Sequence, residues 1–183
     1  MIRRTRDIPQ PLIGWNNVNV HLWGPECLSR NSIIDNGLAS TVWTANLLIF
    51  IPLLLIEPLL VSQFFWINGA TAQDNTDVGI YSFDGQTKFG STGSTLNSGT
   101  SALQVADVTD FRLPSNVRLW MALGCDSSTH TFLLANPVVG AQDLAGITQQ
   151  AAGWSSGLPA TITPAIPTVA KVPMFGFSGR SVV

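Results

Sequence analysis

Charged side chains are scarce in this sequence. Its 183 residues include 9 Lys and Arg and 11 Asp and Glu, so 11% are charged, against about 25% in ordinary globular domains. A free-standing monomer usually covers its surface with mixed charge to stay dispersed in water. The scarcity therefore predicts either a surface rich in Ser, Thr, Asn and Gln or a surface that lies against partners in a permanent assembly. We favour the second interpretation.

Basic clusters and cysteine motifs are also missing. The formal net charge is −2 and the pI about 5.5, so no basic face indicates a nucleic-acid partner. Arg3, Arg4 and Arg6 are too few for a polybasic arm, and prolines and asparagines follow them in place of the apolar stretch of a secretory signal. Cys27 and Cys125 lie far apart without a C-x-x-C pair, which predicts two buried thiols in a reducing compartment.

The sequence lacks an unbroken membrane span, although residues 46–67 look like one. A bilayer needs about 20 consecutive apolar residues in one helix. Pro52 and Pro58 interrupt this run, and each proline inside a helix costs about 3 kcal/mol. Glu57 adds roughly 2.5–3.5 kcal/mol at the bilayer centre. Strands that are covered on both faces also read as continuous apolar runs, so we predict two buried strands at residues 47–56 and 59–67, with a membrane-anchored protein as the remote alternative.

The chain divides into an N-terminal arm and one β domain. Residues 1–37 show no helical period and end in the turn signal Asp-Asn-Gly, so they predict an extended anchoring arm with one or two short strands. Two tryptophans in this arm should dock on the domain or on a neighbouring molecule. The expected partner-binding residues of the arm are Trp15, Trp23, Arg3, Arg4 and Arg6.

Residues 38–183 predict short strands separated by turns. Alternation and turn residues place strands at 78–83, 86–89, 103–111, 117–124, 129–134 and 172–177, and allow a short edge strand at 95–96. Residues 141–152 form the one candidate helix. Residues 158–173 carry four prolines, which predicts an extended edge or a wrapping segment. We therefore predict an all-β fold, an antiparallel β-sandwich of jelly-roll type that follows the extended arm.

Several motifs follow one another in a recognisable order. They are the hairpin VGIYSFDG at 78–85, Ser-Thr-Gly at 91–93, a Leu-Pro turn at 113–114 before LWMAL at 119–123, and Gly-Leu-Pro-Ala at 157–160. With the strands at 47–52 and 59–67, this order resembles a β-sandwich domain that recurs in virion proteins of tailed bacteriophages. The likeness departs at Asn116-Val117-Arg118, where a glycine-tyrosine pair is more usual. The resemblance implies a particle component without catalysis, either a head-surface protein or a tail module for host recognition.

Catalytic and metal-binding patterns are weak. Residues 153–157 (GWSSG) match the G-x-S-x-G nucleophile elbow, but the prolines that follow prevent the helix that this elbow needs. The two histidines and two cysteines lack the paired spacing that is typical of zinc ligands. Aspartates at 74, 77, 107 and 110 are as typical of turns as of a calcium site. We therefore expect no enzyme, no cofactor and no metal.

Most aromatic residues lie in predicted strands and are expected in the core. Trp43 and Trp154 have small or polar neighbours, so they are the candidates for surface stacking on a sugar or a partner. We expect a non-enzymatic virion protein, assembled in the host cytoplasm, that binds capsid or tail proteins and forms a homo-oligomer, with a trimer as one option. Because no heptad stem is present, a capsid cement or decoration protein is the first expectation. A tail-fibre or tail-appendage module that recognises a host receptor or glycan is the alternative.

Overall fold

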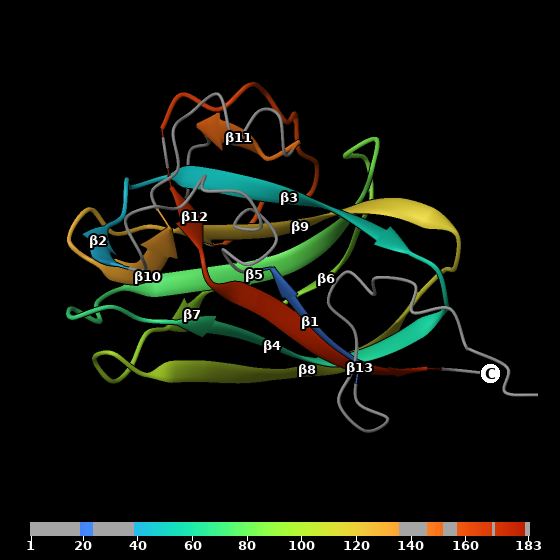
Figure 1. Cartoon of the computed structure of the whole chain (residues 1–183), viewed down its shortest axis with the longest axis horizontal. Helices are drawn as coiled ribbons and strands as arrows, with labels where there is room; N and C mark the ends of the chain where they lie inside the picture. Colours follow the sequence, from blue (N-terminus) through green and yellow to red (C-terminus); the bar gives the residue numbers. More distant parts are fainter. Residues whose placement is uncertain (1–18, 24–38, 136–145, 152–156, 170, 182–183) are drawn as a thin grey trace, which may run out of the picture.

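The computed structural model describes residues 19–23, 39–135, 146–151, 157–169 and 171–181. These residues form strands and loops, and every strand pair is antiparallel (Figure 1). The predicted all-β antiparallel sandwich is thereby confirmed. The predicted arm lies outside the described residues, except for the five residues of its strand β1.

Two sheets form the sandwich. The larger sheet has the order β11-β3-β9-β5-β6, with β7 paired to β5. Its strands are β3 (Leu47–Leu55), β5 (Asn75–Ser82), β6 (Lys88–Ser91), β7 (Thr95–Leu96), β9 (Val117–Cys125) and β11 (Thr148–Ala151). The smaller sheet has the order β1-β13-β4-β8. Its strands are β1 (Asn19–Trp23), β4 (Leu59–Ile67), β8 (Leu103–Leu113) and β13 (Phe175–Ser181).

A third sheet of short strands closes one end of the sandwich. Its order is β12-β10-β2, and its strands are β2 (Ala39–Val42), β10 (Thr131–Ala135) and β12 (Val172–Pro173). Figure 1 shows β3, β9 and β5 side by side in the upper half of the molecule and β4 and β8 below them. β10 and β2 lie together at the left of this view.

The long apolar run forms β3 and β4, one strand in each sheet, as predicted. Alternate residues of β3, such as Ile49 and Ile51, share the main core with Val61 and Phe64 of β4, which lie on either side of a break in the β4 alternation. Glu57 is exposed in the turn between the strands. Beyond Phe50, β3 no longer pairs with β11, so the proline at position 52 lies where one side of the strand has no ladder to disrupt. Among the described residues, no helix has the length and apolar character that crossing a membrane requires.

A smaller apolar cluster lies on the outward face of the larger sheet. Leu48 and Phe50 of β3 point away from the main core and are covered by Leu158 and Ile162. The backbone N–H of Ile162 donates to the carbonyl of Gly85 over 2.9 Å. The segment 157–162 therefore crosses the outward face of the sheet, so that both faces of β3 are buried near its start.

Two strands differ from the sequence-based predictions, and one cysteine agrees with them. The candidate helix at 141–152 is wrong over Thr148–Ala151, which is strand β11, because its backbone pairs with β3. Residues 141–145 and 152 lie outside the described part of the chain. β2 was not predicted, since its four residues, ASTV, carry no clear alternation of apolar and polar side chains. Cys125 is a buried free thiol, as expected, and Cys27 is not among the described residues.

A buried polar cluster joins the two sheets. The indole N–H of Trp66, on β4, donates to the side-chain oxygens of Asn97 and Asn68, at 2.9 and 3.1 Å. The amide nitrogen of Asn97 in turn reaches the hydroxyl of Thr76, on β5, over 3.0 Å, and two backbone carbonyls. Asn97 is buried, so its side chain ties β4 to β5 at the edge of the core.

Replacing Asn97 with Ala should therefore lower the free energy of unfolding by about 2–3 kcal/mol, because it leaves buried donors and acceptors without partners. Urea denaturation measures the change. The matched control is Gln86→Ala, at an exposed position on a hairpin, which should change stability by less than about 0.5 kcal/mol. Equal effects of the two substitutions would contradict the proposed tie.

Candidate binding groove and the cluster behind it

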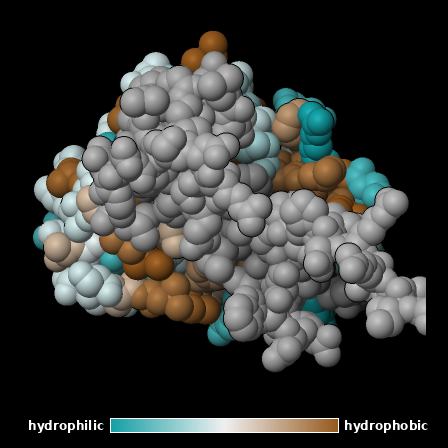
Figure 2. All heavy atoms as spheres, in the orientation of Figure 1, coloured by the Kyte–Doolittle hydropathy of each residue, from teal (hydrophilic) through white to brown (hydrophobic). Residues whose placement is uncertain are grey.

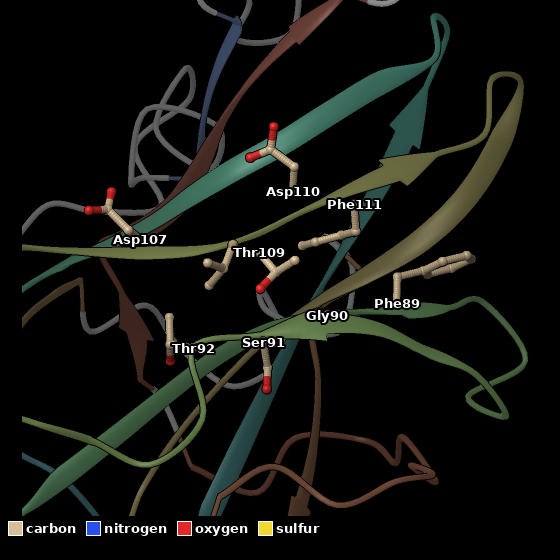
Figure 3. Close-up of a pocket in the computed structure, with 9 residues that line it drawn as sticks. Phe89, Gly90, Ser91, Thr92, Asp107, Thr109, Asp110 and Phe111 are labelled. Atoms are coloured by element: carbon tan, nitrogen blue, oxygen red, sulfur yellow. The ribbon is translucent and has the colours of Figure 1, made fainter.

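A groove of about 490 Å³ lies between β6, at the edge of the larger sheet, and β8, at the edge of the smaller sheet (Figure 3). Its walls come from residues that lie about twenty positions apart in the sequence. They are Phe89, Gly90, Ser91 and Thr92 from β6 and its end, and Asp107, Val108, Thr109, Asp110 and Phe111 from β8.

A large bulge shapes the β8 wall. Val61 of β4 is opposite Phe111 and Gln63 is opposite Asp107, so three residues of β8 lie opposite Ser62 alone. Such bulges bend a strand and re-aim its side chains. In Figure 3, Thr109 and Phe111 point toward β6, whereas Asp107 and Asp110 point away from it.

One end of the groove is closed by Phe111 on Gly90. A Cβ atom at Gly90 would lie 2.5 Å from the Phe111 ring, closer than two carbon atoms can approach. Glycine at this position therefore lets β6 approach β8. The Phe111 ring also stacks on Phe64 of the core, with ring centroids 6.1 Å apart, which fixes the ring in place.

The rim of the groove carries two carboxylates that already have polar neighbours. Asp107 accepts a hydrogen bond of 2.7 Å from the side chain of Gln63. Asp110 lies 4.0 Å from Arg180 in an exposed ion pair, a class that contributes little stability. Asp110 and Arg180 also line a second hollow of about 230 Å³, so the two hollows adjoin at Asp110.

A buried carboxylate lies behind the groove. Asp77 of β5 is 1% exposed and accepts hydrogen bonds from the hydroxyls of Thr92 (3.0 Å) and Ser91 (3.3 Å). It also accepts the backbone N–H of Leu158 over 2.8 Å. Burial raises the pKa of Asp77 above its ordinary value, although these hydrogen bonds and the charge of Lys88 act in the opposite direction.

Two more side chains of the same hairpin bind the backbone of the covering segment. The ammonium of Lys88 donates to the carbonyl of Leu158 over 2.8 Å, and the hydroxyl of Tyr81 donates to the carbonyl of Pro159 over 2.6 Å. Burial and the nearby Asp77 raise the pKa of Tyr81, so its hydroxyl stays a donor. The hairpin, the Ser-Thr-Gly element and Gly-Leu-Pro-Ala, which are separate motifs in the sequence, therefore meet in one cluster. Its contacts join strands to the covering segment, which is a structural role.

A buried histidine lies at the opposite end of β5. Nδ1 of His130 accepts the backbone N–H of Gln73 over 3.1 Å, so the proton of the neutral ring is on Nε2. Nε2 has no hydrogen-bond partner among the described residues, and the ring meets Phe132 edge to face at 4.3 Å. Burial lowers the pKa of His130 to about 4.

The expected site residues are mostly not brought together. Trp43 was expected at the surface, but this is wrong: it is 2% exposed and packs edge to face on Phe132 at 5.1 Å. Trp23 lies in β1, opposite Phe175. Trp15, Trp154 and the three arginines of the arm, Arg3, Arg4 and Arg6, lie outside the described residues. Sequence reasoning missed the groove, because the approach of Gly90 to Phe111 that shapes it is a contact between two sheets and has no signal in the sequence.

Within the described part of the chain, no three metal-ligating side chains come together. Asp77 is engaged behind the groove, and Asp107 and Asp110 contact Gln63 and Arg180. Comparison of the chain with protein families, with curated proteins and with solved structures gives no match.

Replacing Asp77 with Ala should release the covering segment. The amide of Leu158 loses its acceptor and two hydroxyls lose theirs, so unfolding should become easier by about 2–3 kcal/mol. Hydrogen exchange at the amides of Leu158 and Ile162 should accelerate at least about tenfold. Asp84→Ala is the matched control, because Asp84 is exposed and bonds within its own turn. Unchanged exchange at Leu158 in the Asp77 variant would show that the carboxylate does not hold the segment.

His130 should make the fold sensitive to acid. Its pKa is about 4 in the fold and about 6.5 in an unfolded chain, so the unfolded state binds the proton more tightly between these values. Stability should therefore fall by about 2 kcal/mol from pH 7 to pH 5 through this residue. His130→Asn keeps an acceptor near Nδ1 but does not titrate, so its urea midpoint should change less over this range. A variant with the same pH dependence as the parent would refute the assignment.

Proposed function

We propose that this chain is a non-enzymatic structural protein of a bacteriophage virion, which binds neighbouring subunits as a capsid cement or decoration protein. The observation that carries the proposal is a pair of exposed apolar patches on the outward faces of the two sheets. The resemblance of the motif order to virion proteins supports a role as a component of a virus particle. The low charge of the chain supports extensive contact with partners.

The first patch, called the β8 patch, consists of Phe65, Ile67, Leu103 and Val105. Phe65 is opposite Val105 and Ile67 is opposite Leu103 in the β4–β8 ladder, so the four side chains form one surface. Leu103 and Val105 are 59% and 55% exposed. In Figure 2, apolar residues gather at the lower left, where β4 and β8 lie in Figure 1.

The second patch, called the β3 patch, consists of Leu54 at the end of β3, Ile56 just after it, and Phe83, whose ring lies near Arg118, the residue opposite Leu54. All three are exposed, Leu54 by 62%. Two residues of β9 hold the ring of Phe83 in place. The ring stacks on that of Trp120 with centroids 4.8 Å apart, and the guanidinium of Arg118 lies 5.8 Å from the Phe83 centroid. A rigid aromatic ring with a neighbouring arginine is typical of residues that dominate binding energy at interfaces.

Patches on different sheets predict contacts with different neighbours. A chain that binds through two unlike surfaces forms head-to-tail contacts, which extend into rings or arrays. Each apolar contact contributes about 25 cal/mol per Å² removed from water, and repetition over many copies multiplies the effect. This is the mechanism of a protein that stabilises a shell.

A tail appendage that recognises the host surface is the second candidate. The groove between β6 and β8 favours it, because aromatic rings, hydroxyls and carboxylates line one hollow, and such a set can bind a polar ligand. Counting copies in purified particles by quantitative mass spectrometry distinguishes the candidates. Hundreds of copies per particle support the shell protein. A copy number that matches the rotational symmetry of the tail supports the appendage. Absence from particles contradicts both candidates.

A lysine in the β8 patch should weaken self-association. Val105→Lys introduces a charge that must lose water at a contact, so the dissociation constant for self-association should rise at least about tenfold. Sedimentation equilibrium measures it. Thr100→Lys, at an exposed loop position just before the strand, adds the same charge and should leave association within about twofold. Equal association of the two variants would exclude the β8 patch as an interface.

A further inference from the structure

β8 presents a long free edge to the groove. Its eleven residues pair with β4, and no other strand of the described part of the chain pairs with them. Long edges are normally protected by charged side chains, proline, a bulge or a covering segment. The strand LQVADVTDFRL contains no lysine and no proline, and its first five residues, before the bulge at 108–110, pair regularly with β4. An edge of this kind can accept an added strand through its backbone.

The outward side chains of β8 define what an added strand must carry. Leu103 and Val105 are apolar and exposed, and the carboxylate of Asp107 follows two residues later. In Figure 3, Asp107 points away from β6. Asp110 already lies near Arg180, so Asp107, whose neighbour is the uncharged Gln63, is the carboxylate left for an incoming cation. A matching strand needs a cation and an apolar side chain two residues apart.

Building on the function proposed above, we propose that residues 4–10 of a second copy of this chain bind as an antiparallel strand along the free edge of β8. This segment, RTRDIPQ, has the required order. With Ile8 opposite Val105, Arg6 is opposite Asp107, and both pairs lie on the regular part of β8 before its bulge. The even-numbered residues share one side of an extended strand, so one register satisfies both the apolar and the charged position.

The prolines of the segment fit this register. Pro9 and Pro11 are two residues apart, so both would direct their ring nitrogens to the same edge of an extended strand. The other edge, formed by the even-numbered residues, keeps all its N–H groups for the ladder with β8. Proline on the outer edge also prevents a further strand from being added.

A second copy supplies this strand more readily than the same chain. Asn19 of β1 is level with Phe111 of β8, because Asn19 pairs with Gly179, Gly179 with Val61 and Val61 with Phe111. From residue 10, at the level of Leu103, to Asn19 the chain would cross four strand spacings and six residues of strand, about 28 Å. The nine intervening steps span at most about 32 Å. A connection within one chain would thus have to run almost straight across the sheet, whereas a neighbour meets no such constraint.

Charge exchange in the full-length chain tests the docking. Arg6→Glu and Asp107→Lys should each weaken self-association at least about tenfold, and the double variant should restore it, since a close ion pair is re-formed with its sign reversed. An equimolar mixture of the two single variants should associate again, because the arm of each variant then matches the groove of the other. The matched control is Arg3→Glu, which has the same change of charge on an odd-numbered residue and should stay within about twofold.

A synthetic peptide of residues 1–12 tests the backbone ladder. It should compete with self-association of the full-length chain. N-methylation at Ile8 removes an N–H on the pairing edge and should weaken competition about tenfold, whereas N-methylation at Asp7, on the outer edge, should have little effect.

Failure of the double variant to restore association, a monomeric mixture or equal effects of the two methyl groups would overturn the docking. If these changes are without effect while the chain still assembles in particles, the docking is wrong and the proposed function stands. A chain that never associates with itself or with a particle contradicts both.

Discussion

The burial of two consecutive apolar strands in two different sheets is the constraint on which this structure depends. The turn at Glu57 connects β3 of the larger sheet to β4 of the smaller sheet. The inward side chains of the two strands form much of the core between those sheets. Because β3 is apolar on both faces, it also needs cover on its outward side, which Leu158 and Ile162 provide. The hydrogen bonds of Asp77, Lys88 and Tyr81 to the backbone of Leu158 and Pro159 hold this covering segment in place. Beyond this covering segment the outward face of β3 has no cover, and the side chain of Leu54 is exposed to water.

The same constraint explains the character of the surface. A chain with few charges has little with which to shield apolar positions that its own segments do not reach. The β3 patch and the β8 patch are such positions, and β8 adds a free backbone edge. Isolated exposed apolar residues are common in monomers, but directly paired ones, such as Phe65 with Val105 beside a free edge, are typical of surfaces that meet another protein. The high share of apolar side chains relative to charged ones therefore links the fold to the proposed assembly.

Local signals made much of the fold predictable. The proline and glutamate between two apolar runs predicted β3 and β4, and the Asp-Gly turn predicted the hairpin after β5. β11 was mistaken for part of a helix, because its strand state depends on pairing with β3, about a hundred residues earlier. Trp43 was expected at the surface from its polar neighbours in sequence, although its contact is Phe132 on a distant strand. The groove depends on Gly90 and Phe111 meeting across two sheets, and no local pattern encodes such a meeting.

If the proposed assembly is right, both apolar patches become buried against neighbours when the chain assembles. Hydroxyl-radical footprinting, read by mass spectrometry, measures side-chain accessibility directly and compares the free chain with the chain in its particle. Oxidation of Leu54, Phe83 and Leu103 should fall severalfold on assembly, while the exposed Ile166 serves as an internal reference. Unchanged oxidation at both patches in the assembled particle would show that neither patch is an interface.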